Sequence, residues 1–170
     1  MTIMKNIIIE KVTLNVGAGK DQGKLEKGVK LIKHLTGLDP IKTHTKKRLQ
    51  AWGLRPGLPI GCKLTIRDKN LIKKLLVDFL KSKENKLTAK QFDNFGNVSF
   101  GIHEYIDIPN VNYNPDIGIM GFQANITLSR PGMRVQKRRL RSQKIPRVHR
   151  INKEEAMTFM KESFQVEVEE

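Results

Sequence analysis

The stretch EKVTLNVGAG, from Glu10 to Gly19, decides the fold class because apolar and polar residues alternate along it. The apolar members are Val12, Leu14 and Val16, and the polar members between them are Lys11, Thr13 and Asn15. A period of two residues is typical of a β-strand with one face buried and the other face in water. The glycines that follow Val16 predict a turn at the end of this strand.

Further segments alternate in the same way and extend the prediction to a sheet. They are Ile60 to Arg67, Val98 to Ile106 and Phe122 to Ser129, with a short strand expected at Ile41 to Thr43. We expect Ile106 on the apolar side of its strand and Tyr105 on the polar side. Because each long strand has a strictly polar side, we expect one sheet with helices on its apolar face and an open polar face.

Three segments have the apolar spacing of amphipathic helices. The first begins after Asp21 and ends at Gly37, and the second begins after Asp68. The third follows Asn152, which forms a capping box with Glu155. The side chains expected on the buried faces of the first two helices are Leu25, Val29, Ile32 and Leu35, and Leu71, Leu75, Leu76 and Phe79.

The charge of the chain is its most unusual property. Among 170 residues, 32 Lys and Arg stand against 17 Asp and Glu, which gives a net charge of +15. Two segments without any acidic residue hold this excess: Ile41 to Arg67 has seven basic residues and Arg130 to Arg150 has nine. A cationic surface kept for solubility would not be confined in this way, so the pattern predicts a polyanionic partner, namely nucleic acid.

Several classes of protein are excluded by the same composition. Membrane insertion is not expected, because no stretch approaches about 18 uninterrupted apolar residues. Cys62 is the single cysteine, which excludes a disulfide framework and a thiolate metal cluster and suits a reducing cytosol. The four histidines (His34, His44, His103 and His149) lack the spacing of metal ligands. We therefore expect neither a metal nor a cofactor.

The residues that would face RNA fall into three groups. The polar sheet face would carry Lys11, Asn15, Lys63, Thr65, Arg67, His103, Gln123 and Asn125, which suit phosphates and riboses. The long loop from Thr43 to Pro59 carries Lys46, Lys47, Arg48 and Arg55 around Trp52, a combination that fits backbone capture and stacking. Trp52 has an alternative role as a packing plug on the loop prolines. The second basic segment adds Lys137, Arg138, Arg139 and Arg141.

This arrangement predicts a single domain, with an RNA-binding core in residues 1–129. Residues 130–170 would add a basic arm, expected to order against RNA, and a short amphipathic helix. From Glu154 to Glu170 the charge reverses, with six acids against Lys161, so this end is expected to face solvent or a basic protein neighbour.

Two other functions compete with this interpretation. The turn from Gly17 to Lys24 lies between a strand and a helix, the context of a phosphate-binding loop in a nucleotide-dependent RNA enzyme. Its match to a Walker A loop fails, because Ala18 replaces a required glycine and Leu25 replaces the hydroxyl residue after Lys24. The third candidate is a basic protein that compacts DNA.

Three motifs resemble the large-subunit ribosomal protein L-five family, the 5S rRNA binders. They are the opening stretch Glu10 to Gly19, RPGLPIGCKLTIR at Arg55 to Arg67, and Phe92-Asp93 followed by Gly96-Asn97 and FGIHE at Phe100 to Glu104. The basic arm and capped helix after Arg130 look like the archaeal and eukaryotic branch. The resemblance implies an α+β fold of two layers with a mainly antiparallel sheet, a place in the central protuberance of the cytoplasmic ribosome, and no catalysis.

The resemblance also implies partners for individual segments. Contacts with 5S rRNA would fall on Lys11, Asn15 and Thr65, and the arm would anchor in 23S rRNA. The loop from Lys46 to Pro59 would touch the P-site tRNA, and a loop near Asn110 to Gly121 would meet a small-subunit protein. Neighbouring large-subunit proteins would complete the surroundings. The family's usual Gly-Gln-Lys-Pro is replaced here by Gly37-Leu38-Asp39-Pro40, so no contact is assigned to Leu38 or Asp39.

Overall fold

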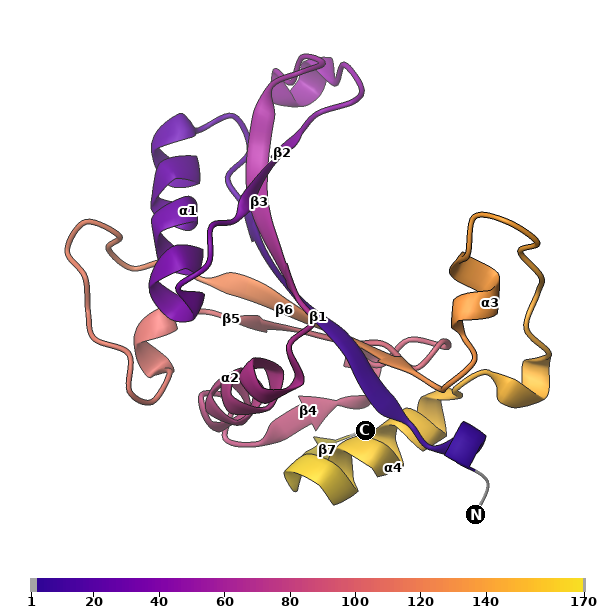
Figure 1. Ribbon diagram of the computed structural model, residues 1–170. Helices are drawn as coiled ribbons and strands as arrows, with labels where there is room; N and C mark the ends of the chain where they lie inside the picture. The colour runs from indigo at the N-terminus through magenta and orange to yellow at the C-terminus, as the bar shows by residue number, and fades with distance from the viewer. Residues whose placement is uncertain (1–2, 170) are drawn as a thin grey trace. The chain divides into compact units, whose positions relative to one another are not determined.

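The computed structural model describes residues 3–169 and shows an α+β fold (Figure 1). One sheet has the strand order β2 (Ile41–His44), β3 (Pro59–Ile66), β1 (Ile8–Gly17), β6 (Phe122–Ser129) and β5 (Val98–Ile102). The neighbours β2 and β3 are antiparallel, with Ile41 opposite Lys63. A second sheet pairs β4 (Lys86–Thr88) in parallel with β7 (Glu167–Glu169). The predicted α+β class with an antiparallel main sheet is confirmed.

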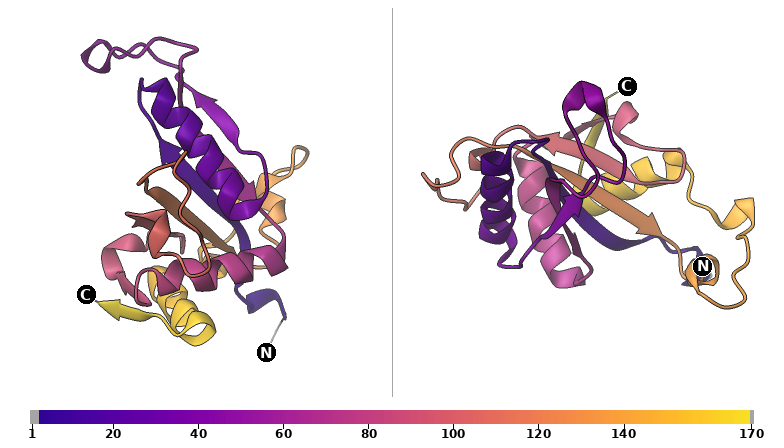
Figure 2. Two further views of the ribbon diagram at one scale, coloured as in Figure 1. Left: turned by 90° about the vertical axis from the view of Figure 1, so that its left-hand side faces the viewer. Right: turned by 90° about the horizontal axis from the view of Figure 1, so that it is seen from above.

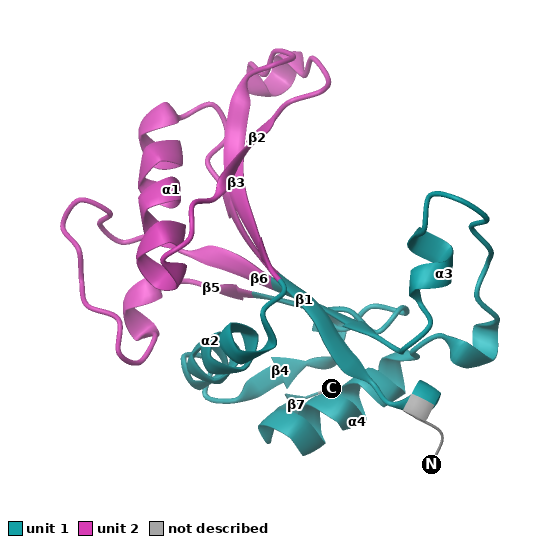
Figure 3. Ribbon diagram, viewed as in Figure 1, with its two compact units in different colours: residues 1–12, 67–100, 125–170 teal, residues 13–66, 101–124 magenta. Residues whose placement is uncertain are grey.

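Helices and strands mostly alternate along the described residues. The α-helices are α1 (Gln22–Thr36), α2 (Lys69–Lys81), α3 (Arg134–Lys137) and α4 (Lys153–Phe164). Short 3-10 helices lie at Ile3–Lys5, Gln50–Trp52, Ala89–Gln91, Tyr105–Asp107 and Arg147–His149. Between β6 and β7, however, α3, a 3-10 helix and α4 follow one another. The chain divides into two compact units (Figure 3): unit 1 contains residues 1–12, 67–100 and 125–170, and unit 2 contains residues 13–66 and 101–124.

Within unit 2, α1 packs against β3 at close range. As predicted, α1 begins after Asp21, whose carboxylate accepts a hydrogen bond from the Lys24 amide at 3.1 Å, and it ends at Gly37 with φ +72°. The predicted buried face was partly wrong, because Gly28 and Leu31 are buried with Leu25 and Ile32. Val29 and Leu35 are only half-buried. At residue 28 the helix backbone lies so close to Val16 and Cys62 that a Cβ atom would be crowded there.

Unit 1 is built around the apolar faces of α2 and α4. Asp68 caps α2 by accepting from the Asn70 amide at 3.0 Å, and Asn152 with Glu155 forms the predicted capping box of α4. Leu71 was predicted to lie on the buried face of α2 but is only half-buried. Ile72 is buried in its place. The buried side chains of the two helices are Ile72, Leu75, Leu76, Phe79 and Leu80 in α2, and Ala156 and Met160 in α4.

The strand prediction was wrong at one point, beyond Ile102. The strand β5 ends there, and the chain forms a 3-10 helix in which Tyr105 is fully buried and Ile106 is 38% exposed. The Tyr105 hydroxyl accepts a hydrogen bond from the Asn114 amide at 2.9 Å, which fixes the ring inward. Because the chain turns between Ile102 and Tyr105, the two-residue period of the strand no longer applies there. Tyr105 is therefore buried and Ile106 exposed, the reverse of the prediction.

The close approach at Gly28 generates a stability prediction. A Cβ atom at this position would lie 2.8 Å from Cγ1 of Val16 and 3.3 Å from Sγ of Cys62, both buried. We expect Gly28→Ala to lower the free energy of unfolding by about 1–3 kcal/mol through overpacking, although alanine favours helices. Urea denaturation measures the change. Gly23→Ala, in the first turn of the same helix, is the control and should be neutral or stabilising; equal stability of the two variants would contradict the predicted clash.

Candidate nucleic-acid interface

The polar side chains of unit 2 meet across three neighbouring strands. Asn15 on β1 donates from Nδ2 to Oε1 of Gln123 on β6, with the atoms 3.2 Å apart. On the other side of β1, the hydroxyls of Thr13 and Thr65 are 3.5 Å apart. Lys63 on β3 is exposed, whereas Asn15 and Thr65 are half-buried. The strands therefore bring Asn15 together with Gln123 and Thr65 together with Thr13. The apolar residues that alternate with them are buried on β1 and β6, whereas Leu64 on β3 is half-buried.

Three predicted members of this polar face belong to unit 1. Lys11 and Asn125 are half-buried on β1 and β6, and Arg67 is exposed directly after β3. His103, in unit 2, is exposed just beyond β5. Each of the four is at least partly accessible and directly follows or precedes a buried apolar residue, and their contact with RNA stays a prediction.

The long loop extends beyond the ends of β2 and β3 (Figures 1 and 2). Its base is closed by the Thr45 amide and hydroxyl, which both donate to the Leu58 carbonyl at 2.9 and 3.1 Å. Its tip is closed by an antiparallel bridge between Leu49 and Leu54. Trp52 is 69% exposed at this tip, so the alternative of a packing plug is wrong. Lys46, Lys47, Arg48 and Arg55 are exposed beside it.

The basic arm follows β6 and contains α3 and the 3-10 helix at Arg147–His149. Arg138, Arg139 and Arg141 are exposed, and the Arg138 Nε donates to the Arg141 carbonyl at 2.8 Å. Lys137 differs from them, because its Nζ forms an ion pair with the Glu10 carboxylate at 2.6 Å. A neighbouring carboxylate offsets the charge of Lys137, so this side chain ties the arm to β1.

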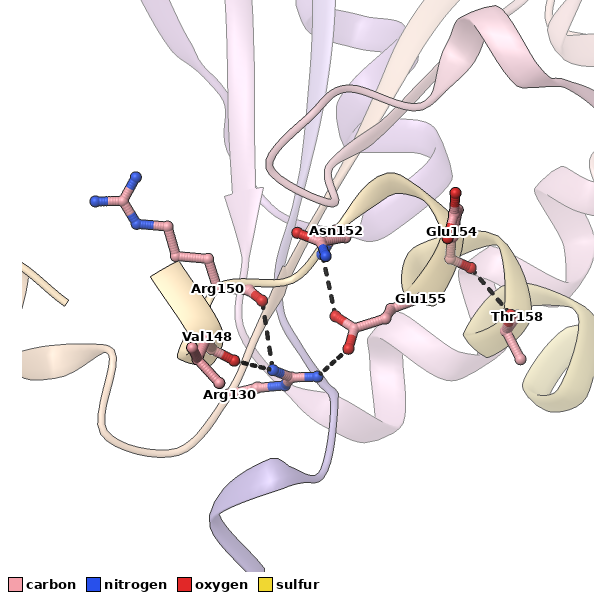
Figure 4. Close-up of polar contacts among 7 residues, drawn as sticks. All are labelled: Arg130, Val148, Arg150, Asn152, Glu154, Glu155 and Thr158. Atoms are coloured by element: carbon pink, nitrogen blue, oxygen red, sulfur yellow. Dashed lines mark hydrogen bonds and ion pairs between the residues drawn. The ribbon is translucent and has the colours of Figure 1, made fainter. Parts of the chain in front are cut away.

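Arg130 stabilises the fold, although it was counted from the sequence among the basic residues expected to bind nucleic acid (Figure 4). It is 8% exposed, and its Nη1 donates to the carbonyls of Val148 and Arg150, each at 3.4 Å. Its Nη2 pairs with the Glu155 carboxylate at 2.7 Å. These contacts join the two ends of the arm to α4. In the structure Arg130 directly follows β6, whose last residue, Ser129, is also buried, but no sequence pattern distinguishes Arg130 from the exposed arginines of the arm.

Glu155 completes this cluster from the first turn of α4. Burial by itself would raise the pKa of the Glu155 carboxyl, but hydrogen bonds from the Asn152 amide and from Arg130 outweigh burial and lower it. The Asn152 amide is 3.0 Å from Oε2, so the carboxylate uses both oxygens. A capping box recognised from sequence therefore has a second function, which is to neutralise the buried arginine.

The glycine turn and the cysteine do not supply an active site. The amides of Ala18 and Gly19 both donate to the Ile60 carbonyl, at 2.9 and 3.0 Å, so they are not directed at a phosphate. Burial raises the pKa of the Cys62 thiol to about 11, which disfavours the nucleophilic thiolate.

Within residues 3–169, no group of three or more His, Cys, Asp or Glu side chains could hold a metal. No helix in this part of the chain is long and apolar enough to cross a membrane.

Comparison with known proteins gives one consistent family. Residues 2–55 match the family model described as Ribosomal protein L5, and residues 59–159 match the model of the C-terminus of the same ribosomal family. Relatives called large ribosomal subunit protein uL5 include those of Methanosphaera stadtmanae (44% identical, covering 99% of this chain and 100% of the relative) and Sulfolobus acidocaldarius (43%, covering 98% and 93%). That of Nanoarchaeum equitans is 44% identical, covering 97% of both chains. The resemblance of the three motifs is thereby confirmed.

The Arg130 cluster predicts a dependence of stability on pH. Because the pKa of Glu155 is lowered on folding, its contribution is present at neutral pH and is lost as pH falls through its folded pKa. We expect Glu155→Gln to lower the free energy of unfolding by about 1–2 kcal/mol at pH 7. The difference in free energy of unfolding between Glu155→Gln and wild type should become smaller below about pH 4, near the ordinary pKa of glutamate. Urea titrations at several pH values measure it, and the exposed neighbour Glu154→Gln is the control; a difference independent of pH would refute the assignment.

Proposed function

The chain belongs to the ribosomal protein L5 family, and from this premise we propose that it binds 5S rRNA in the central protuberance of the large ribosomal subunit. As a member of this family it is a structural constituent of the large ribosomal subunit. Its role in the proposal is to hold folded RNA in place, and no step of it requires catalysis. RNA binding of this kind depends on phosphate and ribose contacts over an accessible surface of matching shape.

The observation that carries this proposal is the cross-strand polar group of unit 2. Asn15, Thr65 and Gln123 offer amides and hydroxyls that both donate and accept hydrogen bonds, as riboses require. The segments of β1, β3 and β6 within unit 2 contain no carboxylate that would repel phosphate. We assign 5S rRNA contacts to this group and to Lys11, Lys63 and Arg67.

The basic arm is the second RNA contact in the proposal, directed at 23S rRNA. Arg138, Arg139 and Arg141 are exposed, and a guanidinium can hold a phosphate through two parallel hydrogen bonds. Lys137 would contact phosphate only if its ammonium group bound the phosphate together with the Glu10 carboxylate or left that carboxylate. Because Arg130 fixes both ends of the arm, less conformational entropy is lost when the arm binds RNA.

The remaining partners would be reached by the loops of unit 2. Exposed Trp52 can stack on a base or ribose of the P-site tRNA while Lys46, Lys47, Arg48 and Arg55 hold its backbone. The loop near Asn110 to Gly121 exposes Tyr113 and Ile119, at 55% and 71%. Apolar side chains of this kind suit a protein partner, which in our proposal is a small-subunit protein. Neighbouring large-subunit proteins would cover other surfaces.

Asn15 gives a direct test of the sheet contact. We expect Asn15→Ala to weaken 5S rRNA binding by roughly 1–3 kcal/mol, because an RNA polar group buried on binding loses its partner. Filter binding at fixed salt measures the change. Asn70→Ala, which removes an exposed amide from α2, is the matched control and should bind like wild type. If Asn15→Ala folds normally and binds with unchanged affinity, Asn15 does not belong to the site.

The arm is tested by the salt dependence of binding to 23S rRNA. Neutralising Arg138, Arg139 and Arg141 together, each to Gln, should reduce the slope of log affinity against log salt by about 0.7–0.9 for each phosphate that is no longer neutralised. The control neutralises Lys73, Lys74 and Lys81 on α2, which changes the net charge equally. Equal slopes for the two triple variants would show that the arm makes no specific phosphate contacts.

A further inference from the structure

Phe95 is an aromatic residue that the functions above leave unused. Its side chain is 65% exposed, although aromatic residues make up only 6% of the chain. A single exposed apolar side chain is ordinary on a protein surface, so exposure alone carries no conclusion. What distinguishes Phe95 is the rigidity of the turn that presents it and the segment against which that turn packs.

The turn is held by its own hydrogen bonds. Phe92 and Val98 form an antiparallel bridge at its base, and the Asp93 amide donates to the Asn97 carbonyl at 3.0 Å. The Asp93 carboxylate then accepts from the amides of Phe95 and Asn97, at 2.9 and 2.7 Å, and from Asn97 Nδ2 at 2.7 Å. The backbone of Phe95 is therefore fixed before any partner arrives, which reduces the entropy lost on binding.

The same turn packs against the end of the basic arm. Gly96 has φ +78°, and a Cβ there would lie 2.5 Å from Cγ2 of Ile151, so the backbone of Gly96 packs directly against the Ile151 side chain. Ile151 is 2% exposed and directly follows Arg150. Arg150 is anchored through its carbonyl by Arg130, while its own guanidinium extends away from that cluster (Figure 4). The turn that carries the exposed Phe95 ring is thus held next to the end of a segment that has nine basic residues and no acidic one.

We propose that Phe95 is a stacking site for an unpaired base of ribosomal RNA whose backbone is held by the basic arm. The inference rests on the proposed RNA binding and adds a nucleobase site to it. A phenyl ring stacks on any base without hydrogen bonds, and adjacent cations supply the backbone contacts that stacking platforms require. The Asp93 carboxylate beside Phe95 is already engaged by the amides of its own turn. A protein partner at this place would have to accommodate the cationic arm as well, so the charge of the arm favours RNA.

The affinities of wild type and three variants for archaeal 5S and 23S rRNA transcripts test this site. Phe95→Leu keeps apolar bulk and removes the π-face, so it should bind the contacted rRNA roughly 5-fold to 150-fold more weakly, the range expected for one stacked base. Phe95→Trp should bind at least as tightly as wild type. The salt dependence should stay unchanged in both, because no phosphate contact is removed. Val77→Ala, which trims an exposed apolar side chain of α2 outside every proposed contact, is the control and should match wild type.

Tryptophan fluorescence gives a second readout, since Trp52 is the single tryptophan. In a Trp52→Phe background, the fluorescence of the Phe95→Trp variant should be quenched by the rRNA, whereas that of Val77→Trp, at an exposed position of α2, should not. The stacking site is refuted if wild type and Phe95→Leu bind rRNA equally well. This holds also if the Phe95→Leu variant is incorporated poorly into large subunits while its affinity for rRNA is unchanged. If wild type itself fails to bind either rRNA, the proposed function is refuted and this inference with it.

Discussion

The burial of alternate residues along β1 is the constraint on which the rest of the structure depends. Val12 and Leu14 are fully buried and Val16 is 4% exposed, and β1 lies between β3 and β6 in the middle of the sheet. A slip of one residue in this strand would exchange its faces and place Lys11, Thr13 and Asn15 in the core. The apolar face therefore fixes the register, and through the register it fixes which amides and hydroxyls face outward. The same residues that stabilise the fold determine the position of the proposed RNA contacts.

The cations of the chain have two different functions that the net charge does not separate. Arg130 and Lys137 are bound to Glu155 and Glu10 and hold the arm, whereas Arg138, Arg139 and Arg141 are exposed. A buried guanidinium would be unfavourable without a carboxylate and carbonyl partners, which explains why Glu155 and two arm carbonyls converge on Arg130. An apparently uniform basic segment is therefore part scaffold and part candidate binding surface.

Features set by neighbouring residues could be predicted from the sequence, whereas features set by distant contacts could not. The caps at Asp21, Asp68 and Asn152, the strand alternation and the exposed loop cations follow local rules and were predicted. The buried face of α1 was predicted only partly because Gly28 meets Val16 and Cys62 on other elements. The exchange of Tyr105 and Ile106 depends on a hydrogen bond to Asn114, and the pairing of Lys137 with Glu10 spans 127 positions. No local pattern in the sequence contains either contact.

The environment of Cys62 has a practical consequence for studying this protein. The side chain is fully buried, and burial raises its pKa to about 11, so the thiolate is strongly disfavoured at neutral pH. Alkylating and oxidising reagents act on accessible thiolates, and this thiol is neither accessible nor ionised. A cysteine introduced on the surface would consequently be the preferred site of a maleimide dye or spin label. Distance measurements on ribosomal particles would then be feasible without removing the native sulfur.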